Sequence, residues 1–160
     1  WPGLLQGWQP NYPGQGAAMF LTYGALHGGP GHAIVNMITL WSLGRMVMEW
    51  VGLRGLGVTY LAALLGGAGG YGLLASTPQP MVGASGALFG LAGGLAVWAY
   101  RARPDRLEAL RFLAWVIAFL VAMNVAMYWA LDGHIAWQTH LGGALAGAFV
   151  ALLLRPTPLP

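Results

Sequence analysis

Five long apolar segments follow one another from residue 32 to residue 154, separated by short stretches rich in proline, glycine and charged residues. These segments cover approximately residues 32–50, 57–75, 85–100, 107–131 and 135–154. About 20 helical residues cross a hydrocarbon core of about 30 Å, so each segment has roughly the length of one membrane crossing, although the third is short. The pattern therefore predicts an all-α, polytopic membrane protein with five transmembrane helices.

The first 31 residues follow a different pattern. Prolines and glycines recur there, with tryptophan and tyrosine side chains between them. Proline interrupts helices, and such aromatic side chains favour the headgroup region of a bilayer. We expect residues 1–31 to form an irregular interfacial loop segment, residues 32–155 to form the transmembrane bundle, and residues 156–160 to be a short tail.

Composition supports lipid as the main solvent. Hydrophobic residues make up 58% of the chain and charged residues only 7%, whereas about 25% of the residues of a soluble domain are charged. Glycine is frequent, with 26 residues, which in membranes indicates helices that approach closely. The chain has no cysteine, which excludes disulfides and thiolate metal sites.

The positive charges orient the predicted bundle. All seven basic residues are arginines, and with five alternating helices every one falls at the same side of the membrane. They are Arg45, Arg54, Arg101, Arg103, Arg106, Arg111 and Arg155. The positive-inside rule makes this side cytoplasmic, and the scattered arginines do not predict a nucleic-acid partner. His32, Ser85 and His140 then lie within roughly 10 Å of the opposite, outer boundary.

Ser85 opens the third segment within the sequence Gly83-Ala84-Ser85-Gly86. A serine at a helix start often serves only as an N-cap. The alternative is a nucleophile, because the helix N-terminus offers N–H donors and positive potential to an oxyanion. Gly83 and Gly86 would let the backbone of a substrate approach closely.

His140 lies inside the fifth segment, three residues before the Gly143-x-x-x-Gly147 pair. A histidine within a membrane helix is costly and is usually functional or partnered. The glycine pair would pack against a small-residue face of the third helix, at Gly86, Gly90, and Gly93 or Gly94, and bring His140 beside Ser85. A serine and a neutral histidine in contact are the minimum apparatus of acyl transfer. The simpler alternative is a histidine bonded to a carbonyl of a neighbouring helix.

His32 and Asn36 are one helical turn apart and therefore share a face. Two side-chain donors side by side would hold the oxyanion of a tetrahedral intermediate. Asn36 could instead only bond a neighbouring helix. A zinc site using His27, His32 and His140 is a competing hypothesis, but no H-E-x-x-H pattern or paired carboxylate supports it, so we predict no metal.

The acidic residues do not complete a catalytic triad. Glu49, Asp105 and Glu108 belong to the cytoplasmic side by topology, far from Ser85. Asp132 precedes the fifth helix on the outer side, where a turn or helix-terminus role fits it best. A Ser85–His140 dyad is therefore the sharper hypothesis.

Together these motifs resemble the rhomboid family of intramembrane serine proteases. The family has His-x-x-x-Asn opening one helix, Gly-x-Ser-Gly opening another and His-x-x-Gly-x-x-x-Gly in the last. The order of the motifs and the interval from His27 to His32 also match, and the resemblance covers residues 20–154. The usual family core has six helices, so the first of them is not visible in this chain, which begins within what resembles the first extramembrane loop.

The resemblance implies hydrolysis of peptide bonds in or beside transmembrane segments of membrane-protein substrates. It makes Ser85 the nucleophile, His140 the general base and acid, and His32, Asn36 and the Ser85 N–H the oxyanion hole. Gly83 and Gly86 would shape the hole and the substrate cleft. Phe89, which stands where the family often has tyrosine, would stack on the imidazole.

The same resemblance implies no metal and no organic cofactor. We expect an integral multi-pass protein of a bacterial plasma membrane, with the bilayer as its surroundings and the active site facing the extracytoplasmic side. The alternative function is a catalytically silent rhomboid-like protein that binds transmembrane clients. A transporter is less consistent with the sequence, because the polar positions stop near the outer third.

Overall fold

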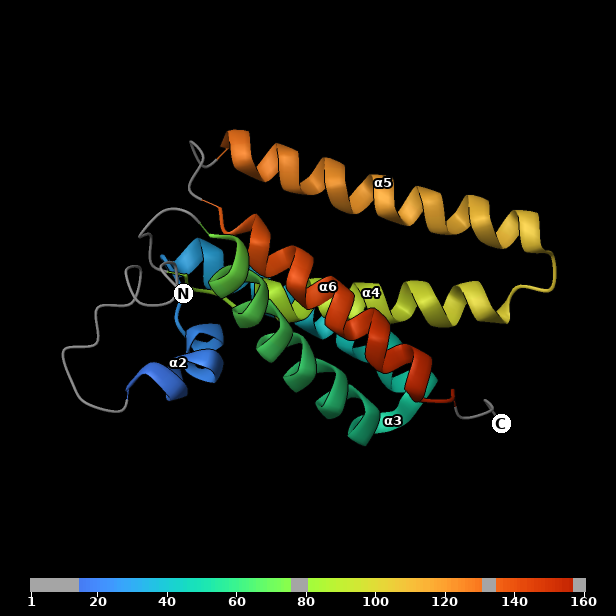
Figure 1. The fold of residues 1–160 in the computed structure, drawn as a ribbon, viewed down its shortest axis with the longest axis horizontal. Helices are drawn as coiled ribbons and strands as arrows, with labels where there is room; N and C mark the ends of the chain where they lie inside the picture. The colour runs from blue at the N-terminus through green and yellow to red at the C-terminus, as the bar shows by residue number, and fades with distance from the viewer. Residues whose placement is uncertain (1–14, 76–80, 131–134, 157–160) are drawn as a thin grey trace.

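The computed structural model describes residues 15–75, 81–130 and 135–156, and in these ranges the chain is helical with no strand (Figure 1). The α-helices are α2 (Gln15–Thr22), α3 (Pro30–Leu74), α4 (Ser85–Ala102), α5 (Arg106–Ala130) and α6 (Trp137–Leu153), with a 3-10 turn η1 (Tyr23–Ala25) after α2. The all-α architecture predicted from the apolar segments is confirmed. Asp132 and the tail residues 157–160 lie outside the described residues.

Helix α3 is folded into two arms at Gly52. This glycine has φ +70° and ψ 179°, while the chain is helical on both sides of it. A residue with a Cβ rarely adopts a positive φ, so glycine permits the reversal. The sequence predicted a connection of several residues between the first two helices; this was wrong, because one glycine makes the turn and the second arm begins at residue 53. Both Pro30–Leu74 and the stretch Arg106–Trp129 are long and apolar enough to span a membrane.

The expectation of an irregular segment over residues 1–31 was wrong for residues 15–25, which are helical. The run Gln15–Thr22 contains no proline and is rich in good helix formers, but at about 12 Å it is far too short to cross a bilayer. The Tyr23 side chain is buried, and its hydroxyl donates to the Leu64 carbonyl at 2.9 Å. The Tyr23 carbonyl accepts from the Gly83 N–H at 3.0 Å. The turn η1 is thus bonded to α3 and to the segment before α4.

Helix α4 lies in the middle of the bundle, in contact with α3 and α6 (Figure 1). A Cβ added to Gly143 or Gly147 would collide with the carbonyl of Gly86 or Gly90 respectively, so α4 and α6 run parallel with their backbones touching. The second arm of α3 approaches α6 in the same way at Gly142. The predicted contact between the glycine face of the last helix and the small face of α4 is present.

The arginine-bearing end of the bundle is closed by side chains of α4. Arg101 donates to the carbonyls of Ala151 and Leu152 at 3.1 and 3.3 Å, and the Trp98 indole donates to the Leu154 carbonyl at 3.3 Å. These bonds satisfy carbonyls that the end of α6 leaves free. They fix the ends of α4 and α6 together, so the two helices are held in register along their whole length.

Helix α5 is packed differently. It lies on the outside of the bundle beside α4 (Figure 1), and Ala109 is its only buried residue among those whose burial is described. Its large apolar side chains, including Trp115, Phe119 and Trp129, are mostly exposed. In a bilayer this surface faces lipid.

Candidate active site

Ser85 is the first residue of α4, but it does not cap that helix. The N-cap position is Ala84, and no side chain makes a capping hydrogen bond there. Instead the Ser85 Oγ lies 2.8 Å from the Nε2 of His140, which is only 2% exposed. The interpretation of Ser85 as a simple cap therefore does not fit the structure.

His140 reaches Ser85 because it lies in the first turn of α6, where α6 packs against the start of α4. The contact of Gly143 with Gly86 sets the distance between the two helices. Thr139 packs in the same gap: a Cβ on Gly86 would lie 2.5 Å from its Cγ2, and its hydroxyl lies 2.7 Å from the Met81 sulfur. Sequence reasoning did not identify Thr139. Its signal was a hydroxyl side chain directly before His140 in an apolar segment.

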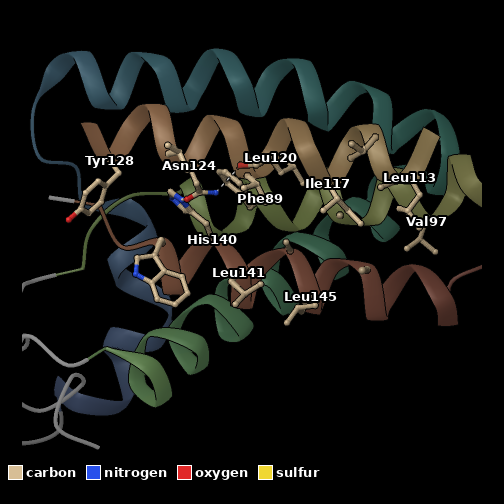
Figure 2. Close-up of a pocket in the computed structure, with 18 of the residues that line it drawn as sticks. Phe89, Val97, Leu113, Ile117, Leu120, Asn124, Tyr128, His140, Leu141 and Leu145 are labelled. Atoms are coloured by element: carbon tan, nitrogen blue, oxygen red, sulfur yellow. Dashed lines mark hydrogen bonds between the residues drawn. The ribbon is translucent and has the colours of Figure 1, made fainter. Parts of the chain in front are cut away.

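The His140 ring is held on its face and at its second nitrogen. Phe89 stacks on it with a centroid distance of 4.2 Å and an interplanar angle of 2° (Figure 2), which is the placement predicted for Phe89. The Nδ1 of His140 lies 2.7 Å from the Oδ1 of Asn124 on α5. Asn124 was also missed, although an amide in the middle of an apolar helix is a recognisable signal.

The orientation of the Asn124 amide assigns the protons of His140. The Nδ2 of Asn124 donates to the Leu120 carbonyl at 3.1 Å, which requires the amide nitrogen to point along α5 and leaves Oδ1 facing His140. An amide oxygen only accepts, so Nδ1 of neutral His140 carries the proton and Nε2 keeps its lone pair. Ser85 then donates its hydroxyl proton to Nε2, which is the arrangement that a general base requires.

Two further donors converge from the first arm of α3. A Cβ added to Gly83 would lie 2.9 Å from the Nε2 of His32 and 3.5 Å from the Nδ2 of Asn36, and Gly83 has φ +117°. Glycine at this position therefore keeps open the space between the two side chains. Asn36 is 4% exposed, and its Nδ2 has no hydrogen-bond partner among the described residues.

The tautomer of neutral His32 is also determined by the backbone. The Gly28 N–H donates to the Nδ1 of His32 at 3.4 Å, so Nδ1 supplies a lone pair and Nε2 carries the proton. The Nε2–H of His32 and the unpartnered Nδ2–H of Asn36 both lie beside the position that a Cβ on Gly83 would occupy. A buried donor without a partner is rare and asks for an explanation, and an oxyanion that forms only during reaction would provide one.

A small cavity joins these groups. It has a volume of about 60 Å³ and is lined by His32, Gly83, Ser85, Thr139 and His140, among other residues. A water molecule occupies about 30 Å³ in the liquid, so the cavity has the size of roughly two waters. Of the residues in the described ranges, no three histidine or acidic side chains gather in a group that would hold a metal ion. His27 contacts His32 edge to face, with 5.2 Å between the ring centroids.

An apolar groove lies on the other side of His140. It is lined by residues of α4, α5 and α6, has a volume of about 880 Å³ and includes Phe89, Leu120 and Leu141 (Figure 2). Asn124 and His140 are the only amide and imidazole groups in its lining. The imidazole therefore separates a small polar cavity from a large apolar groove.

Comparison with known proteins identifies the family. The Rhomboid domain model matches residues 14–157. The rhomboid protease GluP of Bacillus subtilis (strain 168) is 34% identical over 134 residues, which cover 84% of this chain and 25% of that protein. RHOMBOID-like proteins 5 and 1 of Arabidopsis thaliana are 34% and 32% identical over 137 and 141 residues, covering 82% of this chain and 42% and 33% of those proteins.

The chain thus spans 25% to 42% of the length of these relatives. No solved structure matches it significantly. Because the family model covers nearly all of the sequence and the fold is a bundle of apolar helices, this membrane protein belongs to the rhomboid family.

Proposed function

We propose that this protein is an intramembrane serine endopeptidase that cleaves transmembrane segments of membrane proteins with a Ser85–His140 dyad. The single observation that carries the proposal is the 2.8 Å contact between Ser85 Oγ and His140 Nε2, with the imidazole in the tautomer that accepts the hydroxyl proton. The relative named as a rhomboid protease supports the same reaction class.

The positions of the groups support the following steps. As Ser85 Oγ attacks the carbonyl carbon of the scissile peptide, Nε2 of His140 takes its proton, and the carbonyl oxygen becomes an oxyanion. His32 Nε2–H, Asn36 Nδ2–H and the Ser85 N–H donate to that oxygen. The imidazolium then gives its proton to the leaving amine, which breaks the C–N bond and leaves an acyl-enzyme. His140 then takes a proton from a water molecule that attacks the ester carbonyl. The ester C–O bond breaks, the imidazolium returns the proton to Ser85 Oγ, and the acyl fragment leaves as a carboxylic acid.

The surroundings of the site favour substrates that come from the membrane. The cavity at Ser85 is small and lies at the end of the bundle opposite the arginines, and the apolar groove lies on the other side of His140. We propose that this end faces the extracytoplasmic side of a bacterial plasma membrane, since the arginine-bearing side is cytoplasmic by the positive-inside rule. No metal or organic cofactor takes part in the proposed reaction.

The test combines an activity-based probe with cleavage of a substrate. The protein, expressed from its complete reading frame and reconstituted in liposomes, is treated with a fluorophosphonate, and the adduct is located by mass spectrometry. We expect labelling at Ser85, and Ser85→Ala should abolish labelling and lower kcat on a transmembrane reporter by at least about 10³-fold. His140→Ala should abolish labelling as well.

A matched control is Ser42→Ala, which removes an exposed serine on α3 and should change neither readout. Activity that survives Ser85→Ala would overturn the proposal. Absence of both labelling and cleavage in the folded wild type would favour the alternative, a catalytically silent rhomboid-like protein that binds transmembrane clients.

A further inference from the structure

We propose that Asn124 of α5 is a positioning residue that holds His140 in its catalytically competent tautomer, so that the working unit is Ser85–His140–Asn124. This inference rests on the proposed function, because it assigns the third group to the same site. Asn124 does not touch the reacting atoms and acts only through the imidazole. The starting observation is the 2.7 Å contact between Asn124 Oδ1 and His140 Nδ1.

The orientation of Asn124 is fixed without reference to His140. Its Nδ2 donates to Leu120 one turn earlier on its own helix, so the bond along α5 decides which end of the amide faces the imidazole. If the amide were turned around, Nδ2 would face His140 and Oδ1 would face the Leu120 carbonyl, which places two acceptors together. The acceptor presented to Nδ1 is therefore built into α5 itself.

The other groups around His140 do not supply this acceptor. Nε2 faces Ser85, and the ring face lies against Phe89, which has no hydrogen-bonding atom. The side of the ring at Asn124 borders the apolar groove, where Leu120 and Leu141 are among the lining residues (Figure 2). Among the described residues, Asn124 alone provides a hydrogen-bond acceptor for Nδ1–H.

Loss of that acceptor would change which nitrogen carries the proton. An Nδ1–H without a partner in apolar surroundings is disfavoured, whereas an Nε2–H can donate to the Ser85 oxygen. The tautomer equilibrium would therefore move toward Nε2–H by roughly tenfold to a hundredfold. In that tautomer Nε2 has no lone pair, so it cannot take the Ser85 proton.

A merely structural role for Asn124 predicts something else. The bond between α5 and α6 would then serve packing, and its loss would lower stability without a change of tautomer in the folded protein. Asn124 is the only amide or charged side chain between residues 112 and 130. Asn124 thus contacts Nδ1 of His140, which is the ring nitrogen that does not contact Ser85.

The experiment compares Asn124→Leu, which removes the acceptor at similar size, with Asn124→Asp, which keeps an acceptor oxygen. The control is Thr39→Val, since the Thr39 hydroxyl makes a comparable bond to a carbonyl one turn back on its own helix, at 2.8 Å to Val35, with no link to His140. Nitrogen-15 NMR of histidine-labelled protein reports the tautomer of His140. Thermal unfolding, kcat and KM on a transmembrane reporter, and the rate of fluorophosphonate labelling are measured on the same samples.

We expect the wild type to show the Nδ1–H tautomer. Asn124→Leu should shift His140 toward Nε2–H and lower both kcat and the labelling rate by roughly tenfold to a hundredfold, with KM nearly unchanged. Asn124→Asp should restore most of the activity, and Thr39→Val should leave tautomer and kcat as in the wild type. Because a nearby carboxylate favours the protonated imidazole, the acid limb of the pH–activity profile of Asn124→Asp should lie at higher pH than in the wild type.

Two results would overturn the inference: wild-type kcat in folded Asn124→Leu, or lost activity while His140 keeps the Nδ1–H tautomer. If Asn124→Leu does not fold, Asn124→Asp decides the inference. This variant must keep most of the activity, and the acid limb of its pH–activity profile must lie at higher pH than in the wild type. Failure of the proposed function gives a different pattern. In that case the wild type shows neither cleavage nor Ser85 labelling, while NMR still reports the tautomer.

Discussion

The interface between α4 and α6 and the flank occupied by α5 are built in opposite ways. Between α4 and α6 the glycines leave no room for a Cβ, so that backbone lies against backbone. Along α5 the side chains are large, mostly exposed and bordered by an apolar groove. Ser85 and His140 stand on the tightly packed pair, whereas Asn124 reaches the site from the loosely packed helix. The molecule thus fixes the distance between Ser85 and His140 by backbone contact, whereas the partner that orients the His140 imidazole comes from a helix with few buried side chains.

The largest effect is expected where the tight contact is broken. In Gly147→Val the side chain would meet the carbonyl of Gly90, and forcing backbones apart costs at least about 1 to 3 kcal/mol of unfolding free energy. Since a displacement of about 1 Å between reacting groups can cost 10²-fold in rate, kcat should fall by that order. Thermal unfolding and reporter cleavage measure the two effects.

The matched control for Gly147→Val is a glycine with open space around it. A Cβ on Gly69 would meet no atom within 4 Å, so Gly69→Val should leave kcat unchanged and alter stability little. If both variants lost activity alike, general sensitivity to larger residues, and not the contact of α6 with α4, would be the cause.

A second variant separates activity from stability at Asn36, the buried amide that α3 contributes beside Gly83. Asn36→Ala removes a donor that has no partner among the described residues, so it should not lower the unfolding temperature. The same donor is proposed to stabilise the oxyanion, and its loss should lower kcat by about 10²-fold. A strongly destabilised Asn36→Ala would instead indicate that the amide holds helices together.

The smallest effects are expected for two alanine substitutions, one on α4 and one on α5, which should change only the free energy of unfolding. Leu91 on α4 is fully buried and Phe119 on α5 is 62% exposed. Leu91→Ala should cost about 2 kcal/mol, the low end for such changes, because lipid is as apolar as the core and mainly packing is lost. Phe119→Ala should stay within about 0.5 kcal/mol. Equal losses in unfolding free energy would show that α5 is held by contacts that this structure does not contain.

The local sequence pattern was enough to predict most of the helices and part of the candidate site. The apolar segments predicted the helices, and small residues around Ser85 and after His140 predicted which two faces meet. His32 and Asn36 were paired by their spacing on one helix. Their predicted roles in catalysis follow from the chemistry of the two side chains, and the variants above test them.

Other features escaped the sequence because they depend on long-range geometry. Asn124 lies 16 residues before His140, on a helix whose rotation no periodicity revealed, since its apolar side chains occur all around. Gly52 was one glycine among many, and only the fold of α3 distinguishes it by its positive φ. The helix α2 was hidden by the prolines that precede it.

The sequence by itself determined the solvent, the helices and their alternating direction, because hydrophobicity and arginine placement act locally along the chain. It also determined which residue types were available for acyl transfer. Only the tertiary structure decided which nitrogen of His140 faces Ser85 and which acceptor faces the other. The position of the proton on the His140 imidazole is fixed by Ser85 of α4 and Asn124 of α5. These two residues come together around the ring only when the helices have packed.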